Sequence, residues 1–94
     1  MILLSQDAVE DVERLRSFLD QNNPDAARRA LAAIWKAIDR LQELPALGMP
    51  TEDAEIRQLV VRFGSSGYIV RYAAPPGDEN ILITRIWHGR EART

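Results

Sequence analysis

SFLDQNNPDAARR, residues 17–29, is the stretch that decides the fold, because it contains the end of one helix and the start of the next. Asn23 is a good helix N-cap, and Pro24 is suited to the first position of a helix. Before this stretch, and after the N-cap candidate Ser5, apolar residues recur at helical spacing at Ala8, Val12, Leu15 and Leu19. After it, the same spacing continues at Ala27, Leu31, Ile34, Ile38 and Leu41, running out at Leu44-Pro45. Two amphipathic helices joined by a short turn are expected to form a hairpin.

The segments on either side of this hairpin have the composition of strands. Ile2–Leu4 is a short apolar run, and three later runs are rich in β-branched and aromatic residues: 55–63, 68–73 and 80–88. Turns at 64–67 and 74–79 separate these three runs, which predicts antiparallel pairing. We therefore expect an α+β fold of order β-α-α-β-β-β: an N-terminal strand, an antiparallel helical hairpin and a three-stranded antiparallel meander, with the helices packed on one face of the sheet.

The last strand does not reveal which of its sides faces the helices. Strict alternation gives one side with Ile81, Ile83, Arg85 and Trp87, and another with Leu82, Thr84, Ile86 and His88. Neither set is cleanly polar, so the pattern leaves the exposure of Trp87 and His88 open.

Length and composition indicate a single domain over residues 1–94. The chain is 46% hydrophobic and 28% charged and contains no cysteine, so its core must form by packing alone. No apolar run approaches the length of a membrane span and the start lacks a signal-peptide pattern, so we expect a cytoplasmic protein. No motif for metal, nucleotide or dinucleotide binding occurs, and no metal or other cofactor is expected.

The net charge of -2 is distributed unevenly along the chain. Residues 1–54 hold ten acidic and six basic side chains, whereas residues 55–94 hold four acidic and six basic ones. Eleven of the twelve basic residues are arginine, which favours bidentate contacts with phosphate or carboxylate. The basic surplus is nevertheless far below that of a dedicated nucleic-acid-binding domain.

Chemistry-bearing residues concentrate in RIWHGRE, residues 85–91. His88 can transfer protons near neutral pH and adjacent arginines can neutralise a phosphate, which is what a metal-free ribonuclease requires. A structural role for His88, and a core or interface role for Trp87, are the simpler interpretations.

Strand arginines form a second candidate set for a phosphate site, or else serve as solvent-side charges: Arg57, Arg62, Arg71 and Arg85. Trp35 lies to one side of the apolar stripe of the second helix and is either a partner anchor or half-buried core.

The ordered segments SQDAVEDV, LQELPALGMP, RQLVV, SSGYIVRY and ITRIWHGRE resemble the RelE/ParE superfamily of type II toxin-antitoxin toxins, and the resemblance covers nearly the whole chain. It implies a small bacterial toxin encoded beside an antitoxin that covers it. RelE-like members are ribosome-dependent mRNA endonucleases, whereas ParE-like members poison DNA gyrase.

Departures from the RelE pattern favour the ParE-like branch. Where RelE-like chains have an arginine directly after SSGY, this sequence has Ile69, and its arginine comes at Arg71. The catalytic tyrosine of a C-terminal helix in RelE-like chains has no counterpart here. Arg90 aligns with another arginine of the RelE site, and Arg62 falls where that family has a strand lysine.

The resemblance therefore implies a toxin that inhibits DNA gyrase by protein–protein contact and binds a cognate ParD-like antitoxin in a hetero-oligomer. Candidates for target binding are Arg85, Trp87, His88 and Arg90. Candidates for antitoxin binding are Leu15, Leu19, Trp35, Arg57, Tyr68 and Arg71. The alternatives are an mRNA endonuclease acting on the ribosome through Arg90, His88 and Arg62, and an inactive homologue that only binds antitoxin.

Overall fold

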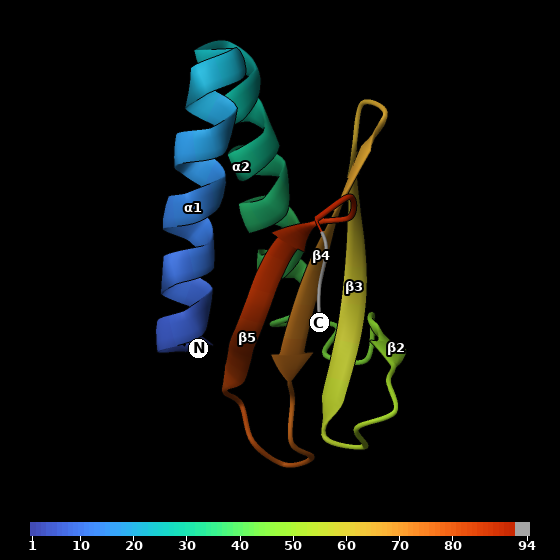
Figure 1. The fold of residues 1–94 in the computed structure, drawn as a ribbon. Coiled ribbons are helices and arrows are strands. Elements are labelled where there is room, and N and C mark those ends of the chain that lie inside the picture. The colour runs from blue at the N-terminus through green and yellow to red at the C-terminus, as the bar shows by residue number, and fades with distance from the viewer. Residues whose placement is uncertain (92–94) are drawn as a thin grey trace.

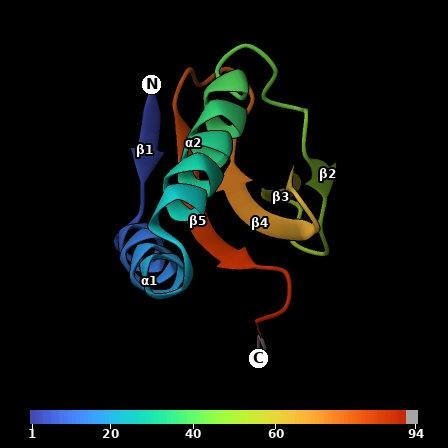
Figure 2. The ribbon, with the colours of Figure 1, turned by 90° about the horizontal axis from the view of Figure 1, so that it is seen from above.

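The computed structural model describes residues 1–91, apart from the side chain of Asn22. The elements are β1 (Ile2–Leu4), α1 (Gln6–Asn22), α2 (Pro24–Arg40), β2 (Met49–Pro50), β3 (Ile56–Phe63), β4 (Ser66–Ala73) and β5 (Ile81–His88). They form one sheet of order β1-β5-β4-β3-β2, with the two helices on one face (Figures 1 and 2). The predicted α+β order is confirmed.

Both predicted helix starts are confirmed by their capping bonds. The Ser5 hydroxyl accepts a hydrogen bond from Ala8 N (3.0 Å), and the Asn23 side chain accepts one from Ala26 N (3.1 Å). α2 ends at Arg40, earlier than the apolar pattern predicts, and the chain continues in tighter turns toward Pro45. Within the described part of the chain, neither helix is long and apolar enough to cross a membrane.

The sheet pairs the two ends of the described chain. The meander β3-β4-β5 is antiparallel as expected, while β1 runs parallel to β5, with Ile2 beside Ile81. Met49–Pro50, which lies outside the runs predicted as strands, forms the short edge strand β2 on β3. The first hairpin is tighter than predicted, because Phe63 pairs with Ser66 and only Gly64 and Ser65 lie between them. Gly64 supplies the positive φ of this turn (60°).

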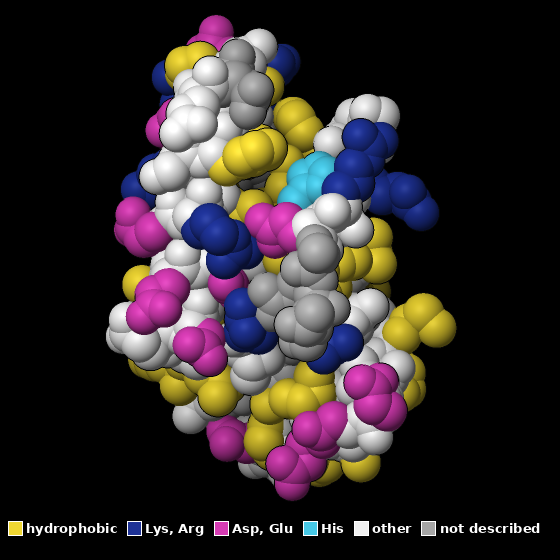
Figure 3. Space-filling view, in the orientation of Figure 1, with side chains coloured by type: hydrophobic (Ala, Val, Ile, Leu, Met, Phe, Trp, Pro, Cys, Tyr) yellow, Lys and Arg dark blue, Asp and Glu magenta, His cyan; other side chains and the backbone are white. Residues whose placement is uncertain are grey.

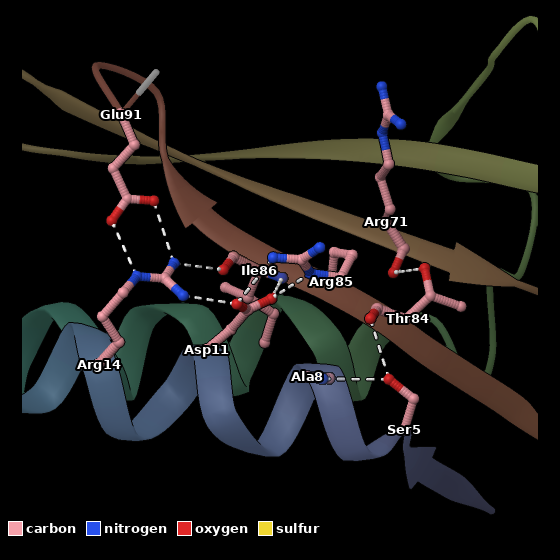
Figure 4. Close-up of polar contacts among 9 residues, drawn as sticks. All are labelled: Ser5, Ala8, Asp11, Arg14, Arg71, Thr84, Arg85, Ile86 and Glu91. Carbon is pink, nitrogen blue, oxygen red and sulfur yellow. Dashed lines mark hydrogen bonds and ion pairs between the residues drawn. The ribbon is translucent and has the colours of Figure 1, made fainter. Parts of the chain in front are cut away.

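A β-bulge in β5 determines which of its residues face the helices. Arg71 pairs with Arg85 but Tyr72 pairs with Ile83, so Thr84 has no partner residue on β4. Its hydroxyl instead donates to Arg71 O (3.1 Å; Figure 4). Strict alternation along β5 is therefore wrong, since the extra residue lets both Ile83 and Ile86 enter the core.

The edge of β5 beyond β1 is closed by side chains of α1. β1 ends at Leu4, where Ser5 N donates to Ile83 O (2.9 Å). The Ser5 hydroxyl donates to Thr84 O (2.9 Å; Figure 4). Further along α1, the Asp11 carboxylate accepts from Ile86 N (2.8 Å) and Arg14 Nη2 donates to Ile86 O (3.2 Å). Helix side chains thus satisfy backbone groups that a neighbouring strand would otherwise pair.

A buried tyrosine fixes the loop between α2 and β2. The Tyr72 hydroxyl accepts from Gly48 N and donates to Pro45 O, both at 2.8 Å. A Cβ on Gly48 would lie 2.7 Å from the Tyr72 ring and hydroxyl, so this close approach requires glycine.

Candidate functional site

A groove opens between the C-terminal half of α1 and the adjoining ends of β4 and β5. Its volume is about 440 Å³, and it is lined by Phe18, Leu19, Ser66, Tyr68, His88, Arg90 and Glu91. Figure 3 shows hydrophobic side chains between the helices and the sheet at this end, with the histidine and cationic side chains along one rim. The side chain of Phe18 is 57% exposed. The site therefore combines an apolar surface with a polar, charged rim.

Strand register brings Tyr68 and His88 together in this groove. The two residues are partners across β4 and β5, and their rings meet edge to face with centroids 5.2 Å apart. Burial raises the pKa of the Tyr68 phenol, so its hydroxyl is protonated at neutral pH. His88 Nδ1 accepts from Arg90 N (3.0 Å), which puts the proton of the neutral ring on Nε2.

A turn after β5 carries Arg90 to the rim of the groove. Gly89 N donates to Gly67 O (2.8 Å), and Glu91 N closes the turn on His88 O (2.9 Å). A Cβ on Gly89 would lie 3.1 Å from Gly67 O, so glycine permits this close contact. The Arg90 side chain is exposed.

A buried carboxylate organises the arginines beside the groove. Asp11 is 2% exposed and accepts from Arg85 Nε (2.8 Å), Arg85 Nη2 (3.2 Å) and Arg14 Nη1 (2.6 Å), besides Ile86 N (Figure 4). Arg14 also forms a forked pair with Glu91, from Nε to Oε1 (3.2 Å) and from Nη2 to Oε2 (3.0 Å). Four charged side chains thus connect α1, β5 and the turn that follows it.

The network favours the charged forms of Asp11, Arg14 and Arg85. Burial alone would raise the pKa of Asp11, but hydrogen bonds from Arg85, Arg14 and Ile86 N outweigh it and lower the pKa below its ordinary 3.8. The hydrogen bonds to Asp11 raise the pKa of the Arg85 guanidinium. Burial acts against the charge of Arg14, yet hydrogen bonds to Asp11 and Glu91 raise its pKa.

This lowered pKa predicts an acid-sensitive part of the stability. The ionised carboxylate stabilises the folded state fully above the unfolded-state pKa, and the stabilisation is lost as pH falls through the lower folded-state pKa. We expect the free energy of unfolding of the wild type to exceed that of Asp11→Asn by an amount that shrinks between about pH 6 and about pH 2. Urea unfolding of both proteins across this range would measure it. A difference independent of pH would contradict the prediction.

The structure gathers some of the sequence-predicted site residues and separates others. Leu19, Tyr68, His88 and Arg90 line the groove. Arg85 lies outside it, held by Asp11. Trp87 pairs with Ile69 on the sheet face away from the helices and is 8% exposed, with the Arg71 guanidinium 5.3 Å from its ring centroid.

The remaining candidates are dispersed over the fold. Leu15 is 1% exposed in the core, so it offers no surface to a partner in this conformation, and Tyr68, 2% exposed, offers very little. Val61 is buried beside Tyr68, so alternation along β3 directs the exposed Arg62 to the opposite face of the sheet.

The other two candidates are partly exposed and in contact with the fold. Trp35 is half-buried and packs against the core. Arg57 donates to Gly48 O (2.7 Å).

Five residues of the groove and its support were missed from the sequence: Asp11, Arg14, Phe18, Ser66 and Glu91. Asp11 did carry a signal, because it occupies the apolar stripe of α1 between Ala8 and Leu15, where an unpaired carboxylate is costly. Among the described residues, no cluster of histidine and acidic side chains is arranged to hold a metal ion.

The fold is shared with a solved structure described as the chromosomal ParDE TA system from P. aeruginosa. The TM-score is 0.73 at 19% identity, over 93% of this chain and 92% of that one. Two Caulobacter vibrioides proteins are similar in sequence: Toxin RelE1, 35% identical over 98% of this chain and 96% of its own length, and Toxin RelE3, 34% identical over 92% and 90%. The family described as ParE toxin of type II toxin-antitoxin system, parDE, matches residues 2–93. The chain belongs to this family of toxins.

Proposed function

We propose that this toxin inhibits DNA gyrase by protein–protein contact through the groove, and that a cognate ParD-like antitoxin neutralises it. The observation that carries the proposal is the composition of the groove, in which an exposed aromatic ring and aliphatic surface lie beside the exposed Arg90. Aromatic and arginine side chains dominate the binding energy of protein interfaces. Gyrase is the target that the ParE-like resemblance implies.

The separation of the basic residues supports contact over RNA cleavage. A nuclease built from Arg62, His88 and Arg90 needs all three around one phosphate, within hydrogen-bonding reach of the reacting atoms. Arg62 lies across the sheet from the groove that His88 and Arg90 line. His88 and Arg90 would therefore have to act without Arg62.

The chemistry of the groove also indicates which kinds of side chain the binding segment of the target should carry. Phe18 and Leu19 offer an apolar surface to an aliphatic or aromatic side chain, while Arg90 offers a cation to an acidic group beside it. Arg85 is paired with Asp11 and therefore contributes mainly by holding β5 against α1. Of the four target-binding candidates, His88 and Arg90 are the ones we retain for direct contact.

The antitoxin is proposed to form a hetero-oligomer with the toxin by covering surface that is partly exposed in this chain. Leu19 and Trp35 supply half-buried apolar surface on the helices, and Arg57 and Arg71 supply cations on the sheet. A disordered segment with alternating apolar and acidic side chains would match both, folding as it binds. Leu15 and Tyr68 are left out of this surface because they are buried in the core.

Toxin freed from its antitoxin should be tested in a gyrase supercoiling assay beside a ribosome-programmed mRNA cleavage assay. We expect inhibited supercoiling and intact mRNA. Arg90→Ala should raise the half-inhibitory concentration about tenfold, the loss of one interface anchor worth about 1.4 kcal/mol. The matched control Arg62→Ala removes another exposed arginine, from the other face of the sheet, and should leave inhibition unchanged.

An mRNA endonuclease is the second candidate, because Tyr68, His88 and Arg90 all line the same groove. Imidazole and phenol groups are the usual proton carriers of metal-free catalysis. Cleaved mRNA with unaffected gyrase would establish this alternative and overturn the proposal. Absence of both activities, with retained antitoxin binding, would identify an inactive binding homologue.

A further inference from the structure

The forked pair between Arg14 and Glu91 lies directly beside the groove and joins α1 to the turn after β5 (Figure 4). Arg14 is not free to follow Glu91, because its other contacts are the buried Asp11 and Ile86 O. Its guanidinium is therefore a fixed point, and Glu91 is the group that is held. A planar guanidinium that binds both oxygens of a carboxylate also fixes the orientation of that carboxylate.

Arg90 is the residue whose position depends on this pair. It lies inside the turn that Glu91 N closes on His88 O, and its own N donates to His88 Nδ1. On one side the turn is tied to the sheet through Gly89 N and Gly67 O. On the other side, the ion pair between Glu91 and Arg14 joins the turn to α1.

The Arg14–Glu91 pair is expected to affect the position of the turn more than the stability of the fold. Both side chains are partly exposed, and ion pairs in contact with water contribute little to folding stability. Loss of the Glu91 charge is therefore expected to leave the midpoint of thermal unfolding nearly unchanged. The same change removes the constraint on one end of a short turn, so its effect should appear in the position of Arg90.

We infer that Arg14 and Glu91 are positioning residues, which hold the turn at 88–91 against α1 so that Arg90 faces the groove. The inference rests on the proposed function for its biological meaning, because Arg90 is there assigned to target binding. Its structural part, the restraint of the turn, is independent of the target.

The test compares Glu91→Gln with Glu91→Asp and with Asp25→Asn in the full chain. Glutamine removes the charge at nearly constant shape, and aspartate restores the charge on a shorter side chain. Asp25→Asn is the control, because it breaks another exposed ion pair, the i,i+3 pair with Arg28 within α2, which does not line the groove. Amide hydrogen exchange by NMR, thermal unfolding and the half-inhibitory concentration for gyrase are measured for each protein.

Glu91→Gln should accelerate exchange of the Arg90 and Glu91 amides and raise the half-inhibitory concentration about fivefold, equivalent to partial loss of an interface anchor. Glu91→Asp should recover part of both effects, and Asp25→Asn should change neither. Unchanged exchange in Glu91→Gln would overturn the inference. Faster exchange with unchanged inhibition by an active toxin would also overturn it, since the restraint would not serve Arg90. If the wild type does not inhibit gyrase, the proposed function fails, while the exchange data still decide whether the restraint exists.

Discussion

Replacing Asp11 with alanine is expected to lower the free energy of unfolding by about 3 kcal/mol, the lower part of the range for breaking a buried ion pair. The substitution removes the acceptor of four hydrogen bonds and leaves the buried Ile86 N–H without its partner. Arg85 and Arg14 are partly exposed and can regain water, which keeps the loss from being larger. Urea unfolding followed by tryptophan fluorescence measures the change.

Two comparison variants separate the causes of this loss. Asp11→Asn keeps an oxygen that can accept from Ile86 N, and should cost about 1 to 2 kcal/mol. Glu13→Ala removes an exposed carboxylate from the same helix and should change stability by less than about 0.5 kcal/mol. Equal losses for Asp11→Ala and Glu13→Ala would mean that Asp11 stabilises the protein only through the electrostatics of the helix, and not through its hydrogen bonds.

Replacing Gly48 with alanine is expected to cost about 2 to 3 kcal/mol, near the upper end for overpacking a buried site. The new Cβ would lie 2.7 Å from the Tyr72 ring and hydroxyl and 3.0 Å from Gln58 O, which is backbone and cannot rotate away. Tyr72 is fully buried, so the ring can move only by disturbing the core. The predicted result is a lower midpoint of urea unfolding at an unchanged slope.

Gly67→Ala is the matched control for this clash. A Cβ there would meet only Val60 Cγ1, at 3.8 Å, so the same substitution should be nearly neutral. Tyr72→Phe removes the hydroxyl and should make Gly48→Ala less costly, because the two changes share one contact. Fully additive losses in the double variant would show that Gly48 is required for another reason.

Local signals in the sequence were sufficient to predict the helices and the meander. Ser5, Asn23 and Pro24 mark helix ends through bonds made within four residues, so their neighbours in sequence determine them. The same holds for the turn at Gly64, which needs a positive φ.

Contacts between distant segments were not predictable in this way. The parallel pairing of β1 with β5 and the bulge at Thr84 depend on partners in other elements. Periodicity alone placed Tyr68 on a strand without showing that it faces the core. For the site, His88 and Arg90 were predicted from their residue types. The roles of Phe18 and Glu91 depend on the packing of α1 beside β5, which the sequence does not show.

The closure of β5 by β1 and α1 has a consequence for the order in which the chain folds. The contacts that Ser5, Asp11 and Arg14 make with β5 span 72 to 79 residues of sequence, whereas β3 and β4 pair across a two-residue turn. Local hairpins close at small entropic cost and long-range pairings form late. During synthesis, the helical hairpin therefore leaves the ribosome before the strand that α1 must cover. The groove, which needs Phe18 from the first helix and His88 from the last strand, is among the last features to be completed.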